Sequence, residues 1–112
     1  MSILSNYGEV FNKNDAKLFA DLFAEDCEFY DTAPTLVGQD AMYVRGKAGI
    51  DMIFTMYFTS MRMEAKLVSI NDNVMDYDIC YVDLPMPPIP CRGTLLEEVD
   101  GKIVRYHVVP RV

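Results

Sequence analysis

Hydrophobic positions in the first quarter of the chain recur at helical spacing and predict two short helices. The first is expected over residues 2–13, with Ser2 as a candidate N-cap and a buried stripe of Ile3, Leu4, Tyr7, Val10 and Phe11. The second is expected to begin at Asn14 or Asp15, to end at Glu25-Asp26 and to bury Leu18, Phe19, Leu22 and Phe23. The two together predict a helical hairpin, with Tyr7 on its buried side.

An alternating pattern follows the second helix and predicts a strand that ends on a carboxylate. Cys27, Phe29 and Asp31 fall on one face of this strand, because side chains alternate at period two. Loss of water around the charged form of Asp31 should raise its pKa, which makes Asp31 a candidate general base. The alternative is that Asp31 caps a turn toward Thr32 and Pro34.

A connection of mixed composition and a third helix come next. The path of residues 32–45 is left open by the sequence, including whether the segment covers the mouth of a pocket, although a short strand is expected at 42–45. A third helix is expected from Gly46 to about Ser60. Apolar side chains extend round much of its circumference, which predicts cover on more than one side.

The remainder of the chain has the period of strands. Four are expected, at residues 64–71, 74–82, 91–99 and 102–109. Asp72-Asn73 and Asp100-Gly101 supply turns, and both residues of the second pair can adopt positive φ, as a two-residue hairpin requires. The proline-rich segment 85–90 lacks the backbone donors of a sheet interior and is expected to form a stiff connection.

This order of elements predicts an α+β fold in a single domain over residues 1–112. A curved antiparallel sheet wraps around three N-terminal helices, and the open end of the resulting cone forms a pocket. A surplus of large side chains, with eight Met, seven Tyr and six Phe, supports such a pocket or a buried interface.

Composition excludes several classes of function. The formal charge of −7 and the scattered basic residues argue against nucleic acid and anionic membranes as partners. Three widely spaced cysteines predict reduced thiols, and the N-terminus lacks the pattern of a signal peptide, so a cytoplasmic location is expected. No cofactor or metal is expected, because no cluster of metal ligands or Gly-rich phosphate loop is present.

His107 is the one histidine of the chain and falls on the last expected strand. Alternation places it with Ile103 and Arg105 on the outer side, opposite the more apolar face that includes Tyr106. A proton-relay role and a surface or dimer-contact role both remain open for His107.

Four segments, in their order and spacing, resemble the nuclear transport factor 2-like superfamily, which includes ketosteroid isomerases and polyketide cyclases. They are Asn14-Asp15 and residues 22–31, 45–50 and 98–104. The resemblance covers nearly the whole chain and implies a cone-shaped α+β barrel of the cystatin-like kind. It also implies a hydrophobic ligand pocket and a homodimer formed through the outer face of the sheet.

The resemblance to the ketosteroid isomerases further implies a catalytic pair. Asp31 would move a proton and Tyr7 would donate a hydrogen bond to a developing enolate. The third group of that machinery, an acid on the penultimate strand, falls at Thr94 or Leu95, and neither residue is an acid. Loss of one of two such donors lowers a rate by about a hundredfold or more, so another substrate, or binding without chemistry, is the alternative.

The expected function is therefore binding of a small hydrophobic ligand, with isomerase- or cyclase-like proton transfer on a carbonyl compound and no cofactor. The residues expected to line the ligand site are Phe29, Phe54, Tyr57, Met61, Leu95 and Tyr106. The alternative is a non-catalytic module for ligand binding, dimerisation or protein interaction.

Overall fold

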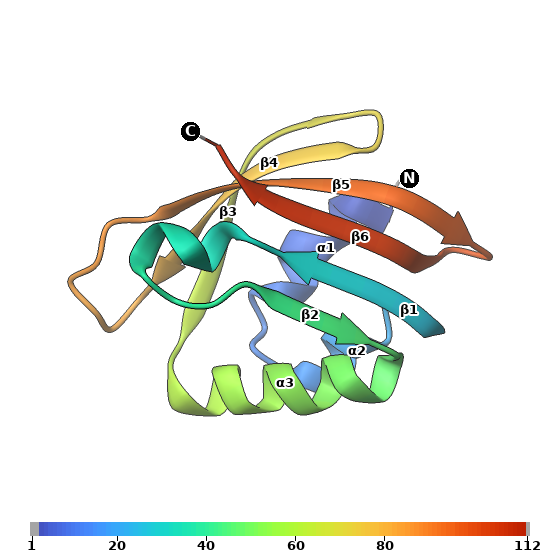
Figure 1. Cartoon of the computed structure of the whole chain (residues 1–112), viewed down its shortest axis with the longest axis horizontal. Coiled ribbons are helices and arrows are strands. Elements are labelled where there is room, and N and C mark those ends of the chain that lie inside the picture. The colour runs from blue at the N-terminus through green and yellow to red at the C-terminus, as the bar shows by residue number, and fades with distance from the viewer. Residues whose placement is uncertain (1–2, 112) are drawn as a thin grey trace.

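The computed structural model describes residues 3–111 and shows helices packed on one face of a curved six-stranded sheet (Figure 1). The elements are α1 (Ile3–Phe11), α2 (Ala16–Ala20), β1 (Phe23–Asp31), the 3-10 helix η1 (Ala33–Val37), β2 (Met42–Arg45), α3 (Lys47–Ser60), β3 (Met63–Asn71), β4 (Val74–Tyr81), β5 (Ile89–Val99) and β6 (Lys102–Pro110). The expected α+β class and curved sheet are confirmed. Ser2, the candidate cap of the first helix, lies outside the described residues.

The strands lie in the order β2-β1-β6-β5-β4-β3. All neighbouring pairs are antiparallel except β1 and β6, which run parallel and so depart from the purely antiparallel sheet expected. The β5–β6 hairpin turns at Asp100 and Gly101, with φ values of 53° and 75°, so the predicted turn is confirmed. The parallel contact brings the end of β1 beside the end of β6.

The second helix is shorter than its pattern predicts, and the boundary placed at Glu25-Asp26 is wrong. The backbone N–H groups of Asp21 and Leu22 donate to the carbonyls of Lys17 and Phe19 and end α2. From Phe23 onward the chain pairs with β6, where Phe23 lies opposite Ile103. Tertiary pairing thus overrides the helical period, and Leu18, expected inside, is exposed.

Two asparagine side chains occupy part of the open edge of β3. The amide of Asn12 donates to the carbonyl of Ala65 at 3.0 Å and accepts from its N–H at 2.6 Å. The amide of Asn14 makes the same pair of hydrogen bonds with Met63, at 2.8 and 3.0 Å. These side chains satisfy backbone groups that a seventh strand would otherwise pair, and they attach the end of α1 to the sheet.

Two further expectations for the strands are wrong. Strict alternation turns Ile103 outward with Arg105, yet Ile103 is fully buried. The register between β5 and β6 shifts twice between Leu95 and Glu98, and the second shift leaves Val104 as an extra residue on β6, which breaks the period of two there. The proline-rich segment also enters the sheet sooner than expected, because β5 begins at Ile89 and the carbonyl of Pro90 accepts from the N–H of Arg111.

The third helix has one buried face rather than cover on several sides. Ile50 and Phe54 are buried against the core, whereas Met52 and Met56 are each 64% exposed. Within residues 3–111, none of the helices has the length and apolar character needed to cross a membrane.

Candidate functional site

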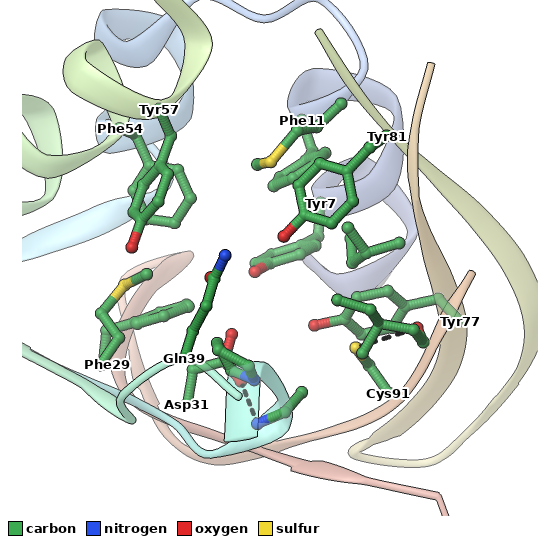
Figure 2. A pocket seen from close by; sticks show the side chains of 16 residues that line it. Tyr7, Phe11, Phe29, Asp31, Gln39, Phe54, Tyr57, Tyr77, Tyr81 and Cys91 are labelled. Carbon is green, nitrogen blue, oxygen red and sulfur yellow. Dashed lines mark hydrogen bonds between the residues drawn. The ribbon is translucent and has the colours of Figure 1, made fainter. Parts of the chain in front are cut away.

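A pocket lies between the helices and the concave face of the sheet (Figure 2). Its volume is about 50 Å³, several times the ~10–15 Å³ that one water needs. The aromatic side chains that line it are Tyr7, Phe11, Phe29, Phe54, Tyr57, Tyr77 and Tyr81. Asp31, Gln39 and Cys91 contribute the other labelled polar or ionisable groups in Figure 2.

Asp31 enters the pocket because it ends β1 on the inward face. Phe29 and Cys27, two and four positions earlier, are both buried. One carboxylate oxygen, Oδ1, accepts the N–H of Ala33 at 2.9 Å, so Asp31 also caps the turn into η1. The two roles read from the sequence are therefore compatible, and Figure 2 shows the Asp31 side chain beside Gln39 at the pocket.

The environment of Asp31 favours its neutral form. Burial raises the pKa of the carboxyl group from 3.8 to about 6, while the hydrogen bond from Ala33 acts in the opposite direction. This is the direction that the strand pattern predicts. At pH 7 a group with this pKa is about 90% ionised, so Asp31 can accept a proton near neutral pH.

Four tyrosines direct their hydroxyl groups into the pocket that Asp31 also lines. Figure 2 shows the hydroxyls of Tyr7, Tyr57, Tyr77 and Tyr81 directed toward the interior of the pocket. Burial raises the pKa of Tyr7 and Tyr77 well above the usual value and that of Tyr81 to a lesser extent. These three hydroxyls remain protonated at neutral pH and can donate hydrogen bonds to a bound oxygen atom.

The hydroxyls of Tyr7 and Tyr77 belong to a cluster with Tyr106. The hydroxyl oxygens of Tyr106 and Tyr77 lie 3.5 Å apart, and the rings of Tyr7 and Tyr106 lie 4.9 Å apart between centroids. Tyr106 is fully buried behind the pocket. The cluster holds Tyr7, from α1, against Tyr77, from β4, and thereby fixes two of the four hydroxyls.

The thiol at the pocket is chemically inert. Burial raises the pKa of Cys91 to about 12, and its Sγ lies 3.4 Å from the carbonyl oxygen of Ile89. Because the thiolate is the nucleophilic form, Cys91 is suited to packing rather than to covalent chemistry.

The structure brings together five of the residues singled out from the sequence. Tyr7, Phe29, Asp31, Phe54 and Tyr57 all line the pocket.

The other three expected lining residues lie elsewhere. Met61 follows α3 and packs against the core, and Leu95 lies opposite Tyr106 in the sheet. Leu95 and Tyr106 are buried and do not border the pocket. Thr94, the other position considered for an acid, lies opposite His107.

Sequence reasoning missed the contribution of β4 and left open whether the connection after β1 reaches the pocket. Tyr77 and Tyr81 line the pocket, as do Ala33, Gln39 and Met42. The alternation along β4 places Tyr77 and Tyr81 on the same face, a signal that could have found them. The connection had no comparable period, and its place at the pocket follows from folding alone.

His107 lies outside the pocket. Its Nε2 is 2.9 Å from Oε1 of Glu28, and its ring meets Tyr30 edge-on at 5.7 Å. The interaction with His107 lowers the pKa of Glu28. In the part of the chain that the structure describes, no three His, Cys, Asp or Glu side chains form a group that could hold a metal ion.

No family model and no curated protein matches the sequence. Solved structures do match. A hypothetical protein with a ketosteroid isomerase-like fold from Catenulispora acidiphila, in complex with trimethylamine, has a TM-score of 0.72 at 14% identity, covering 95% of this chain and 82% of that chain.

Two proteins of unknown function show the same relationship. A nuclear transport factor 2-like protein from Mesorhizobium loti has a TM-score of 0.72 at 17% identity, covering 98% of this chain and 88% of that chain. A SnoaL-like protein from Burkholderia thailandensis has a TM-score of 0.70 at 10% identity, covering 97% of this chain and 92% of that chain. At these identities the similarity shows the fold, and the chain has the nuclear transport factor 2-like fold that its sequence resembles.

Proposed function

We propose that the pocket binds a small carbonyl compound and that Asp31 transfers a proton on it without a cofactor. The observation that carries this proposal is a half-buried carboxylate with a pKa of about 6 at a pocket that several tyrosine hydroxyls enter. A base with a pKa near the working pH and neutral donors beside it suit proton abstraction next to a carbonyl group.

The proposed step moves one proton and leaves the pocket unchanged. The Asp31 carboxylate removes a proton from the carbon beside the carbonyl, and the electron pair of that C–H bond forms the enolate. Tyr7 donates a hydrogen bond to the enolate oxygen, and Tyr77, held in the same cluster, supports the Tyr7 hydroxyl. Protonated Asp31 then returns the proton, to the same carbon or to another carbon of the enolate.

The size of the pocket favours a small ligand over a steroid. Ligand sites for drug-sized molecules usually enclose about 300–1,000 Å³, well above the space here. The Catenulispora acidiphila protein of the same fold holds trimethylamine, which supports a ligand of few atoms for this chain as well.

Binding without chemistry is the second candidate function. It is favoured by the absence of a carboxylic acid at Thr94 or Leu95, the positions where the resemblance puts a second oxyanion donor. In this case Asp31 would serve as a recognition group for the ligand.

Deuterium exchange of a simple ketone separates the two candidates. Cyclopentanone in D₂O exchanges the protons beside its carbonyl, and NMR follows the rate with and without the protein. We expect the wild type to accelerate exchange, Asp31→Asn to abolish the acceleration, and Tyr7→Phe to reduce it by about a hundredfold. Glu28→Gln, which removes a carboxylate from the outer face, serves as the control and should exchange like the wild type.

The outcome also tests the second candidate. Equal acceleration by Asp31→Asn would exclude Asp31 as the base. Saturable binding of cyclopentanone with no acceleration by the wild type would favour the non-catalytic function.

A further inference from the structure

The lining of the pocket carries a single ionisable carboxyl group and no basic side chain among the residues that the structure describes. Three arginines on or directly after β5 and β6 are engaged elsewhere. Arg111 pairs with Asp78, Arg105 lies 3.7 Å from Glu28, and Arg92 forms a two-point contact with Asp76. The ionised form of Asp31 therefore has no counter-charge inside the pocket.

The geometry points to small alkylammonium ions as a ligand class of this pocket, with Asp31 as their ionic partner. The inference takes its site from the proposed function and adds the charge of the ligand. An ammonium N–H can donate to the Asp31 carboxylate, and a charged donor and acceptor form the stronger kind of hydrogen bond.

The rest of the lining suits such an ion. The hydroxyl oxygens of Tyr57, Tyr77 and Tyr81, directed into the pocket, have lone pairs that accept further N–H groups. Alkyl groups find apolar contacts at Phe29 and Phe54. Aromatic rings near a desolvated cation add electrostatic attraction through their quadrupoles.

The same charge pattern disfavours acidic ligands. A carboxylate or phosphate in the pocket would lie close to ionised Asp31 with no Lys, Arg or His side chain in the lining to balance it. The formal charge of −7 on the chain adds long-range repulsion of anions and attraction of cations.

Binding of an ammonium ion is linked to the protonation of Asp31. The ion requires the carboxylate, so its affinity should fall as the pH drops through about 6, the pKa of Asp31. By the same linkage, a bound ammonium ion should lower the pKa of Asp31, whereas a neutral ligand should not.

Titrations with trimethylammonium chloride and tert-butanol test the charge requirement. The two probes are similar in shape and differ in charge, and protein NMR shifts of the Asp31 and Ala33 amides report their binding. We expect trimethylammonium to bind and to lose about tenfold or more in affinity in Asp31→Asn, which keeps the shape and removes the charge. Glu98→Gln, the same kind of change at the far end of β5, should bind like the wild type.

The pH dependence of trimethylammonium binding by the wild type provides a second test. Between pH 7 and pH 5 the ionised fraction of a group with a pKa of about 6 falls about tenfold, and the affinity for trimethylammonium should fall with it. The pKa of Asp31, followed by carboxyl-carbon NMR, should drop when trimethylammonium saturates the site.

Three outcomes would overturn the inference: no binding of trimethylammonium, equal binding by Asp31→Asn, or tert-butanol binding as tightly. These outcomes are independent of ketone exchange. Binding of trimethylammonium without ketone exchange would reject proton transfer and support the ammonium site. Ketone exchange without binding of trimethylammonium would support proton transfer and reject the ammonium site.

Discussion

The hydroxyl of Tyr106 lies directly over Gly93 on the neighbouring strand, in the space that a β-carbon on Gly93 would occupy. Gly93 has no unusual φ, so its role is close approach rather than backbone freedom. The missing side chain lets Tyr106 lie flat across β5 and reach Tyr77. One glycine thus permits the tyrosine cluster behind the pocket.

Replacement of Gly93 by alanine should destabilise the fold. The new methyl group would overlap the ring and hydroxyl of Tyr106, and overpacking of this kind costs about 1–3 kcal/mol. Urea unfolding measures the change in the free energy of unfolding. Gly8→Ala is the matched control, because nothing lies near its new β-carbon and alanine favours a helix by about 0.5–1 kcal/mol. Equal stability of Gly93→Ala and the wild type would contradict the close approach.

Replacement of Asp31 by asparagine should stabilise the protein at neutral pH. The folded-state pKa of about 6, against the ordinary 3.8, corresponds to about 3 kcal/mol lost on ionisation in the folded state. As the pH falls through 6 toward 4, folded Asp31 takes up a proton before the unfolded chain does, so the wild type regains this stability. Asparagine can still accept the N–H of Ala33.

Urea unfolding at pH 7 and pH 4 checks this prediction. The free energy of unfolding of Asp31→Asn should exceed that of the wild type by up to about 3 kcal/mol at pH 7 and by little at pH 4. A gap of the same size at both pH values would show that the carboxyl group is not desolvated.

Removal of the asparagine amides at the β3 edge should also lower stability. Asn12→Ala loses both hydrogen bonds to Ala65 and should cost about 1–3 kcal/mol in the free energy of unfolding. Asn14 has a φ of 54°, so Asn14→Gly removes its bonds without strain, and Asn14→Ala should be less stable still. Thermal or urea unfolding ranks the variants.

Asn6→Ala on the exposed side of α1 is the control for the edge variants and should lie within about 0.5 kcal/mol of the wild type. A variant of Asn12 as stable as this control would mean that the β3 edge does not depend on the amide.

We propose a homodimer through the outer face of the sheet, and Tyr43 offers a test. Tyr30, Tyr43 and Val109 are exposed apolar side chains of β1, β2 and β6, and the rings of Tyr30 and Tyr43 meet at 5.9 Å. Light scattering after size exclusion should show a dimer for the wild type and a monomer for Tyr43→Glu. Met52→Glu places the same charge on exposed α3 and should leave the dimer intact. A monomeric wild type would reject the proposal.

The helical and strand spacing of apolar residues was sufficient to predict most of the fold and the position of Asp31, the central residue of the site. Alternation along β1 places Phe29 and Asp31 on the inner face, and helical spacing places Tyr7 on the buried side of α1. The Asp100-Gly101 turn could also be predicted, because a positive φ favours particular residue types whatever the rest of the chain does. These features depend on a few neighbouring residues only.

The end of α2 and the burial of Ile103 could not be read from local period. Phe23 fits the helical stripe, yet pairing with β6 converts it into strand. Ile103 is turned inward where an extra residue of its own strand, Val104, shifts the register with β5, and its N–H donates to the carbonyl of Leu22. In both cases hydrogen bonds to a distant segment decide the local conformation.

Tertiary structure alone decided which inward-facing residues border open space. Leu95 and Tyr106 face inward as expected, but they are buried in the sheet and its tyrosine cluster, away from the pocket. Tyr77 and Tyr81 line the pocket because the curvature of the sheet brings β4 across from Asp31. The sequence by itself determined which face each side chain takes, since that follows from local backbone geometry. Whether the space beside it is filled depends on the packing of segments far apart in the chain.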